Sequence, residues 1–214
     1  MLIYLCLIVK PNSKLLTYNL IDLCKNLIVS YNNVILEENW LEIYESYEIL
    51  FKANELDKTK LLLQSKMPDY IDLIFINKKN RKKKLLIADM DSTIIKEETL
   101  DEIARSAGIY DKISNITNLA MQGNTNFVSA LKERVSYLKG INLTNLRYVL
   151  ENKITLNGGA EILVKTMKKN KCKLALVSGG FSFFANEIGE MLGFDYIKSN
   201  TLEIKNNNLT GKLI

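Results

Sequence analysis

The first third of the chain alternates between apolar runs and helical patterns. Leu2–Val9 is almost wholly apolar, which is typical of a buried strand. Leucines then recur three or four residues apart, which indicates one face of a helix. The predicted elements are the strand Leu2–Val9, a helix that buries Leu16, Leu20, Leu23 and Leu27, strands at Val34–Glu38 and Tyr44–Phe51, a helix at Glu55–Gln64 and a strand at Ile71–Ile76. This βαββαβ order predicts a ferredoxin-like α+β domain over residues 1–77.

The pattern changes after a basic stretch at residues 78–84. The short run Leu85–Ala88 predicts a parallel strand that is buried on both faces. Four amphipathic helical patterns follow, around Ile103, Ile113, Leu131 and Val149, and they predict a helical cap over about residues 97–153. The remaining predicted elements are a helix at Ala160–Lys169, a strand at Lys173–Val177, a helix at Phe181–Leu192, a strand at Asp195–Lys198 and a hairpin within Leu202–Ile214. Residues 85–214 therefore read as an α/β domain with a helical insertion after its first strand.

The composition narrows the chemistry that the chain can carry. Hydrophobic residues make up 47% of the chain, enough for a globular core. The chain has no histidine, which excludes a Ser-His-Asp triad and any metal site with histidine ligands. Its three cysteines, Cys6, Cys24 and Cys172, lie far apart and form no C-x-x-C pair. Reduced thiols and a cytoplasmic location are therefore expected.

Two segments raise the question of a membrane or nucleic-acid partner. The apolar run Met1–Val9 is too short to span a bilayer and has no positive residues before it, so no membrane association is expected. The net charge is +5, and much of the excess lies in Lys78–Lys84. This run could bind nucleic acid, or it could be a solvated linker. It contains no aromatic residue for base stacking, which favours a linker and no nucleic-acid partner.

The strongest chemical signal is the segment Asp89-Met90-Asp91-Ser92-Thr93, which follows the apolar run Leu85–Ala88 directly. Catalytic residues of open α/β sheets gather at the carboxyl ends of strands. Two carboxylates two residues apart on a turn can converge on one ligand, so that one attacks and holds a metal while the other moves a proton. The alternative is an Asp–Ser–Thr turn that caps a helix.

A second signal is Ser178-Gly179-Gly180-Phe181, which also follows an apolar strand and opens a predicted helix. A hydroxyl and free N–H groups at a helix N-terminus form an anion site. A plain serine cap with glycines for the turn is the alternative interpretation. Together, the two strand-end motifs predict a phosphate held between an attacking carboxylate and polar donors.

These two motifs are accompanied by Glu97–Thr99, Asp101–Ala104, Asn126-Phe127 and Arg134-Val135. The whole set resembles the motifs of the phosphoserine phosphatases of the haloacid dehalogenase superfamily. The resemblance runs from about Leu85 to Leu213, and the N-terminal segment resembles the small ACT-like domain found ahead of the phosphatase in many bacterial members. It implies a Rossmannoid parallel sheet with an inserted helical cap. It also implies Mg²⁺-dependent hydrolysis of O-phospho-L-serine to L-serine and phosphate, the last step of serine biosynthesis.

The resemblance implies roles for the strand-end residues. Asp89 would be the nucleophile that becomes an aspartyl phosphate. Asp91 would protonate the leaving serine oxygen and then activate water. The Asp89 carboxylate and the Asp91 main-chain carbonyl would ligate Mg²⁺, while Ser178 and the Gly179 N–H would bind phosphate oxygens. A bridging hard cation would remove the repulsion between an anionic nucleophile and a phosphate.

The resemblance also implies residues that recognise the substrate. Glu98 would face the ammonium group of phosphoserine and Arg134 its carboxylate. Met121 and Phe127 would line the pocket from the cap. Each has a plainer interpretation: Glu98 as a first-turn acid on a helix, Arg134 as a solvated helix charge, and the two apolar side chains as core.

The family pattern continues with a phosphate-binding lysine and a G-D-x-x-N-D motif, neither of which occurs before Ile214. We therefore expect a truncated chain with an unpaired sheet edge, an uncovered sheet face and weak or absent catalysis. Two alternatives remain open: another phosphatase or phosphotransferase on the same fold, and an inactive, amino-acid-binding regulatory fragment. The sequence also leaves a homodimer open.

Overall fold

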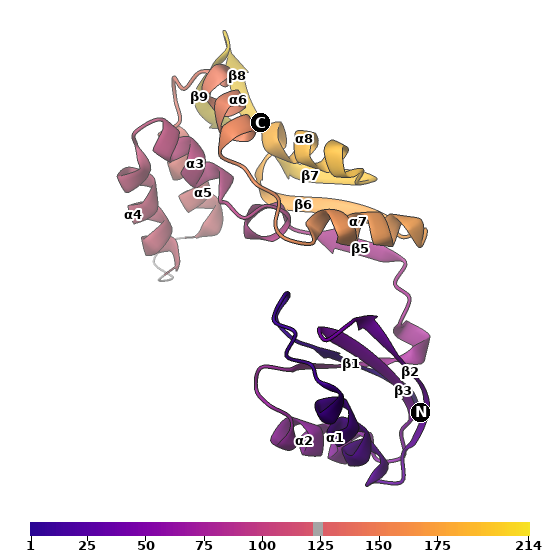
Figure 1. The fold of residues 1–214 in the computed structure, drawn as a ribbon. Helices are drawn as coiled ribbons and strands as arrows, with labels where there is room; N and C mark the ends of the chain where they lie inside the picture. The colour runs from indigo at the N-terminus through magenta and orange to yellow at the C-terminus, as the bar shows by residue number, and fades with distance from the viewer. Residues whose placement is uncertain (122–125) are drawn as a thin grey trace. The chain divides into compact units, whose positions relative to one another are not determined.

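A computed structural model describes the backbone of residues 1–121 and 126–214, and the side chains of these residues except 117–121 and 127. The chain forms two compact units, Met1–Lys83 and Lys84–Ile214, each with its own sheet and hydrophobic core (Figure 1). The predicted fold class is confirmed: an antiparallel α+β unit precedes an α/β unit with a parallel sheet. Within the described ranges, no helix is long and apolar enough to cross a membrane.

The first unit has the strand order and directions of a ferredoxin-like fold. Its sheet runs β2-β3-β1-β4, and every neighbouring pair is antiparallel. One face of the sheet buries Leu5, Ile49 and Phe51 in a core shared with Cys24 and Ile28 of the first helix. The elements are β1 (Leu2–Ile8), α1 (Tyr18–Val29), β2 (Val34–Glu42), β3 (Ser46–Lys52), α2 (Leu56–Lys66) and β4 (Asp72–Asn77).

Two details of the predicted first unit are wrong. Helix α1 buries Ile21, Cys24 and Ile28, whereas Leu23 is 39% exposed. Of the predicted stripe, Leu16 is fully buried ahead of α1, and Leu20 and Leu27 pack against the same core, so the burial prediction fails at Leu23. Tyr44 does not begin β3: its φ of +64° places it in the turn between β2 and β3.

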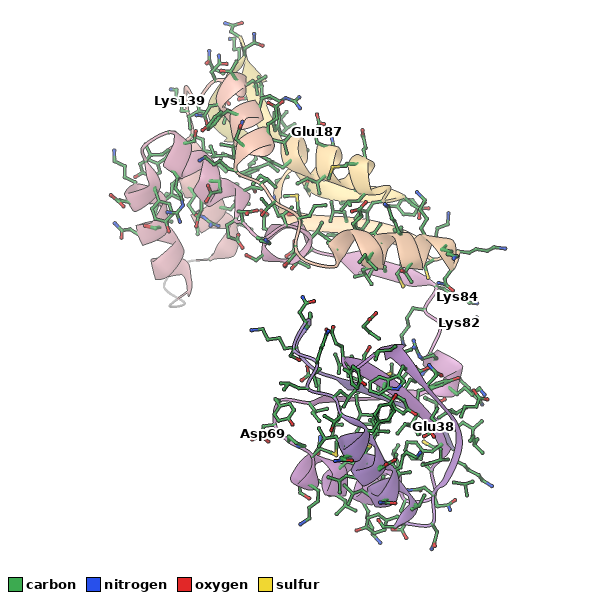
Figure 2. The ribbon with its side chains drawn as sticks, viewed as in Figure 1. Glu38, Asp69, Lys82, Lys84, Lys139 and Glu187 are labelled. Carbon is green, nitrogen blue, oxygen red and sulfur yellow. The ribbon has the colours of Figure 1, made fainter. Side chains whose placement is uncertain are left out.

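The basic stretch is not simply a solvated linker. Lys78–Asn80 form a short 3₁₀ turn, and the Arg81 guanidinium pairs with the buried Glu48 carboxylate at 2.6 Å. The same guanidinium lies 5.6 Å from the centre of the Tyr4 ring. Arg81 thus belongs to the first unit, and the exposed residues Lys82–Lys84 lead to the second (Figure 2).

The sheet of the second unit is parallel, in the order β5-β6-β7. Helices α7 and α8 pack against it. The prediction that the first strand is buried on both faces is wrong, because Leu85 is 52% and Ile87 62% exposed. Their neighbours Leu86 and Ala88 point into the core instead, so only one face of β5 is covered in the described structure. The elements are β5 (Leu85–Ala88), α7 (Ala160–Lys169), β6 (Lys173–Phe181), α8 (Ser182–Leu192) and β7 (Tyr196–Asn200).

Four helices form an insertion between β5 and α7, and a hairpin packs beside it. Strand β9 contacts α5, and a Cβ at Gly211 would lie 2.9 Å from the Ser136 carbonyl oxygen, so this close approach requires glycine. Asn206 and Asn207, both with positive φ, make the tight turn of the predicted hairpin. The elements are α3 (Thr99–Ser106), α4 (Tyr110–Met121), α5 (Phe127–Ser136), α6 (Leu143–Asn152), β8 (Leu202–Lys205) and β9 (Asn208–Leu213).

Candidate active site

The two aspartates lie where β5 ends and the chain turns toward the helical insertion. The irregular turn η2 (Met90–Ile94) follows Asp89, whose Oδ1 accepts a hydrogen bond from the Met90 N–H at 2.7 Å. Asp91 has an extended backbone, with φ −63° and ψ 137°, and its side chain is half-buried. Both side chains border the same cavity.

The Asp91 carboxylate is held from two sides. Its Oδ1 accepts a hydrogen bond from the Thr99 N–H, the first residue of α3, at 2.8 Å. Its Oδ2 accepts a hydrogen bond from the Ser178 hydroxyl at 3.3 Å. Burial raises the pKa of Asp91 above its ordinary value, although the hydrogen bonds from Thr99 and Ser178 oppose this shift. The site thus fixes one acid while leaving Asp89 exposed.

The Ser178–Phe181 segment departs from the prediction. It lies in the extended end of β6, and α8 begins only at Ser182, so its donors do not belong to the first turn of a helix. The Gly180 N–H donates to the Ser178 hydroxyl at 2.8 Å, and the Asn200 side-chain amide donates to the Gly179 carbonyl at 2.8 Å. The contact with Asn200 joins this extended segment to the neighbouring strand β7.

Two charged side chains of opposite sign line the cavity. Glu98 lies just before the helical insertion, and Arg134 lies within it. Glu98 precedes α3, and its Oε1 accepts a hydrogen bond from the Ser92 hydroxyl at 2.7 Å. Arg134 of α5 is half-buried, and its Nε donates to the Ala130 carbonyl at 3.3 Å. Burial lowers the pKa of Arg134, while the charges of Asp101 and Glu98 raise it.

The structure brings five of the predicted site residues to one cavity of about 180 Å³. Ser178 contacts the cavity-lining Asp91, whereas the side chains of Met121 and Phe127 lie outside the described residues. Five further lining residues had no predicted role. Thr99, Gly180 and Phe181 lie in segments that the sequence analysis singled out, whereas sequence reasoning missed Leu100 and Leu131 entirely. The lining residues are Asp89, Asp91, Glu98, Thr99, Leu100, Leu131, Arg134, Gly179, Gly180 and Phe181.

The oxygen atoms at the end of β5 suit a hard divalent cation. Mg²⁺ prefers oxygen ligands and is usually bound through one or two carboxylates together with water and substrate phosphate. Asp89 and Asp91 supply such atoms at one cavity. Among the described side chains, no group of three or more acids or thiols gathers into a complete metal cage. The donor set therefore fits Mg²⁺ better than a softer metal.

The second unit is similar to known hydrolases. Residues 83–212 match the haloacid dehalogenase-like hydrolase family. The phosphoserine phosphatase of Archaeoglobus fulgidus is 45% identical over 134 residues, which are 63% of this chain and 39% of that protein. A substrate-bound phosphoserine phosphatase structure is 41% identical, with a TM-score of 0.58 over 63% of each chain.

The similarity in fold extends to both units. A haloacid dehalogenase family hydrolase from Salmonella enterica serovar Typhi covers 100% of this chain at a TM-score of 0.77 and 26% identity, over 72% of its own length. The chain spans between 39% and 62% of the length of the curated phosphoserine phosphatases from Archaeoglobus fulgidus and Methanocaldococcus jannaschii.

Proposed function

Because this chain belongs to the haloacid dehalogenase-like hydrolases, we propose that it carries the active site of a Mg²⁺-dependent phosphoserine phosphatase. The observation that carries the proposal is the lining of one cavity by Asp89, Asp91, Glu98 and Arg134. Asp89 and Asp91 suit phosphoryl transfer. The charges of Glu98 and Arg134 match the ammonium and the carboxylate of an amino acid. The cavity of about 180 Å³ favours a small ester, since pockets for larger ligands measure roughly 300–1,000 Å³.

In the first half of the reaction, an Asp89 carboxylate oxygen attacks phosphorus, and the bond from phosphorus to the serine oxygen breaks. Asp91 donates a proton to that oxygen, so L-serine leaves and an aspartyl phosphate remains. In the second half, Asp91 accepts a proton from water, whose oxygen attacks phosphorus. The bond from phosphorus to the Asp89 oxygen breaks, which releases inorganic phosphate and regenerates the Asp89 carboxylate. Its hydrogen bonds to Thr99 and Ser178 orient Asp91 beside the cavity.

The other residues bind and orient the substrate. The Gly179 N–H and the Ser178 hydroxyl would donate to phosphate oxygens, since Gly179 lines the cavity and Ser178 contacts the lining residue Asp91. Glu98 would accept hydrogen bonds from the substrate ammonium, and Arg134 would donate to its carboxylate. Asp89 and the Asp91 main-chain carbonyl would hold Mg²⁺, which when bound neutralises charge on the phosphoryl oxygens.

The test is phosphate release from O-phosphoserine, a sugar phosphate and a nucleoside monophosphate, each with and without Mg²⁺. We expect phosphoserine to be the preferred substrate and Mg²⁺ to be required, with a low turnover because the chain has neither the phosphate-binding lysine nor the G-D-x-x-N-D motif of the family pattern. Asp89→Asn should abolish this turnover while phosphoserine still binds. Asp111→Asn, an exposed acid of α4, is the matched control. Preference for another ester would contradict the substrate, and near-normal turnover by Asp89→Asn would contradict the nucleophile.

A further inference from the structure

Ser92 follows the second aspartate and has an unusual backbone. Its φ of +51° and ψ of +13° lie in the left-handed region. Glycine adopts this conformation without a steric penalty, whereas a residue with a Cβ does so at a cost. A side chain at such a position needs a compensating interaction.

The Ser92 side chain makes that interaction with Glu98. Its hydroxyl donates to Glu98 Oε1 at 2.7 Å, and its main-chain N–H donates to the Glu97 carbonyl at 3.1 Å. Glycine at this position would keep the main-chain hydrogen bond and lose only the one to the carboxylate. The hydroxyl therefore acts on the Glu98 side chain and not on the course of the backbone.

The position of Glu98 at the cavity links its hydrogen bond with Ser92 to ligand binding. Glu98 and Arg134 line the same cavity, and their opposite charges attract each other. A glutamate side chain has three rotatable bonds, so an unrestrained Glu98 could turn toward the guanidinium or into solvent. The hydrogen bond from Ser92 opposes both movements. It keeps one anionic and one cationic group available for separate groups of a ligand.

We propose that Ser92 is a positioning residue that selects substrates with an ammonium group, because its hydroxyl holds the Glu98 carboxylate toward the cavity. This inference rests on the proposed function and adds a determinant of its specificity.

The experiment compares two ligands that differ only in the ammonium group: O-phosphoserine and 3-phosphooxypropanoate. Binding is measured by calorimetry in the Asp89→Asn protein, so that neither ester is hydrolysed. Ser92→Ala removes the hydroxyl, and Ser92→Gly removes it while also relieving the backbone. Ser65→Ala, which removes an exposed hydroxyl of α2, is the matched control.

We expect both Ser92 variants to reduce the preference for phosphoserine about tenfold, the change that a lost hydrogen bond to a charged group produces. Affinity for 3-phosphooxypropanoate should stay within about twofold, and Ser65→Ala should change neither affinity. A merely structural role for Ser92 would weaken both ligands equally, and that result would overturn the inference. So would an undiminished preference in Ser92→Ala. If the protein with Ser92 intact does not prefer or bind phosphoserine, the proposed function itself is contradicted, and the inference fails with it.

Discussion

Gly180 shows how a single missing side chain shapes the site. A Cβ at this position would lie 2.5 Å from Asp91 Oδ2 and 3.1 Å from the Ser178 hydroxyl oxygen. The φ of Gly180 is not positive, so the backbone conformation would accept another residue. Glycine is required here only because a side chain would not fit. The space that a methyl group would take is therefore reserved for the Asp91 carboxylate.

We predict that Gly180→Ala displaces Asp91 and lowers the free energy of unfolding by about 1–3 kcal/mol, the usual cost of overpacking. Gly158→Ala is the matched control, because a Cβ there meets nothing within 4 Å. Urea denaturation of both variants measures the difference. Equal stability of the two variants would show that Asp91 moves aside without cost.

At the scale of elements, two short segments join the helical insertion to the sheet. The Lys96 N–H donates to the Thr155 carbonyl at 3.0 Å, and the Asn157 N–H donates to the Ile94 carbonyl at 2.8 Å. The Glu97 carboxylate accepts hydrogen bonds from the Thr155 N–H at 2.8 Å and its hydroxyl at 2.6 Å. Burial opposes ionisation of Glu97, but these bonds hold its pKa below the usual value.

We predict that Glu97→Ala loosens this connection, because the carboxylate accepts hydrogen bonds from both the N–H and the hydroxyl of Thr155. The amide of Thr155 should exchange with solvent about tenfold faster, consistent with the loss of one charge-assisted hydrogen bond. Glu190→Ala, which alters an exposed acid of α8, is the control. Hydrogen exchange followed by nuclear magnetic resonance gives the rate for each amide. Unchanged exchange at Thr155 would mean that the main-chain hydrogen bonds alone hold the connection.

The elements that sequence patterns predicted best are those fixed by local signals. Helix α7 spans Ala160–Lys169 as predicted, since Gly159 ends the preceding loop and the apolar spacing is unambiguous. The end of β6 was missed, because Gly179 and Gly180 are extended where the Asn200 amide, which is distant in sequence, binds the Gly179 carbonyl. Local propensity favours a turn at two glycines, and a tertiary contact overrides it.

The site residues also divide into those that local sequence patterns predict and those that only the tertiary structure brings to the cavity. Asp89, Asp91 and Gly179 could be found because each follows an apolar strand, and strand ends meet at one edge of a parallel sheet. Leu131 reaches the cavity from the helical insertion, and no local pattern separates a helix face that lines a pocket from one that packs in a core. The Thr99 N–H could have been suspected, since the first amides of a helix lack partners within it.

At the scale of the whole molecule, the chain has two separate hydrophobic cores, and each contains cysteine. Cys24 is fully buried in the core of the first unit, and Cys6 is buried in its sheet beside Glu48. Cys172 is buried in the core of the second unit. Burial raises the pKa of Cys24 to about 12, and burial with the neighbouring Glu48 raises that of Cys6 to about 11. Little thiolate therefore exists in the folded first unit at pH 8.

We predict that the thiols react with a disulfide reagent at pH 8 only when the unit that holds them opens, so labelling in urea reports on each core separately. Because the cores share no residue, the two units should unfold at different urea concentrations. Cys172→Ala isolates the signal of the first unit, and Cys6→Ala combined with Cys24→Ala isolates that of the second. One common midpoint for all three thiols would show that the units unfold as a single cooperative body. Two midpoints would show that the site in the second unit depends for its stability on its own core.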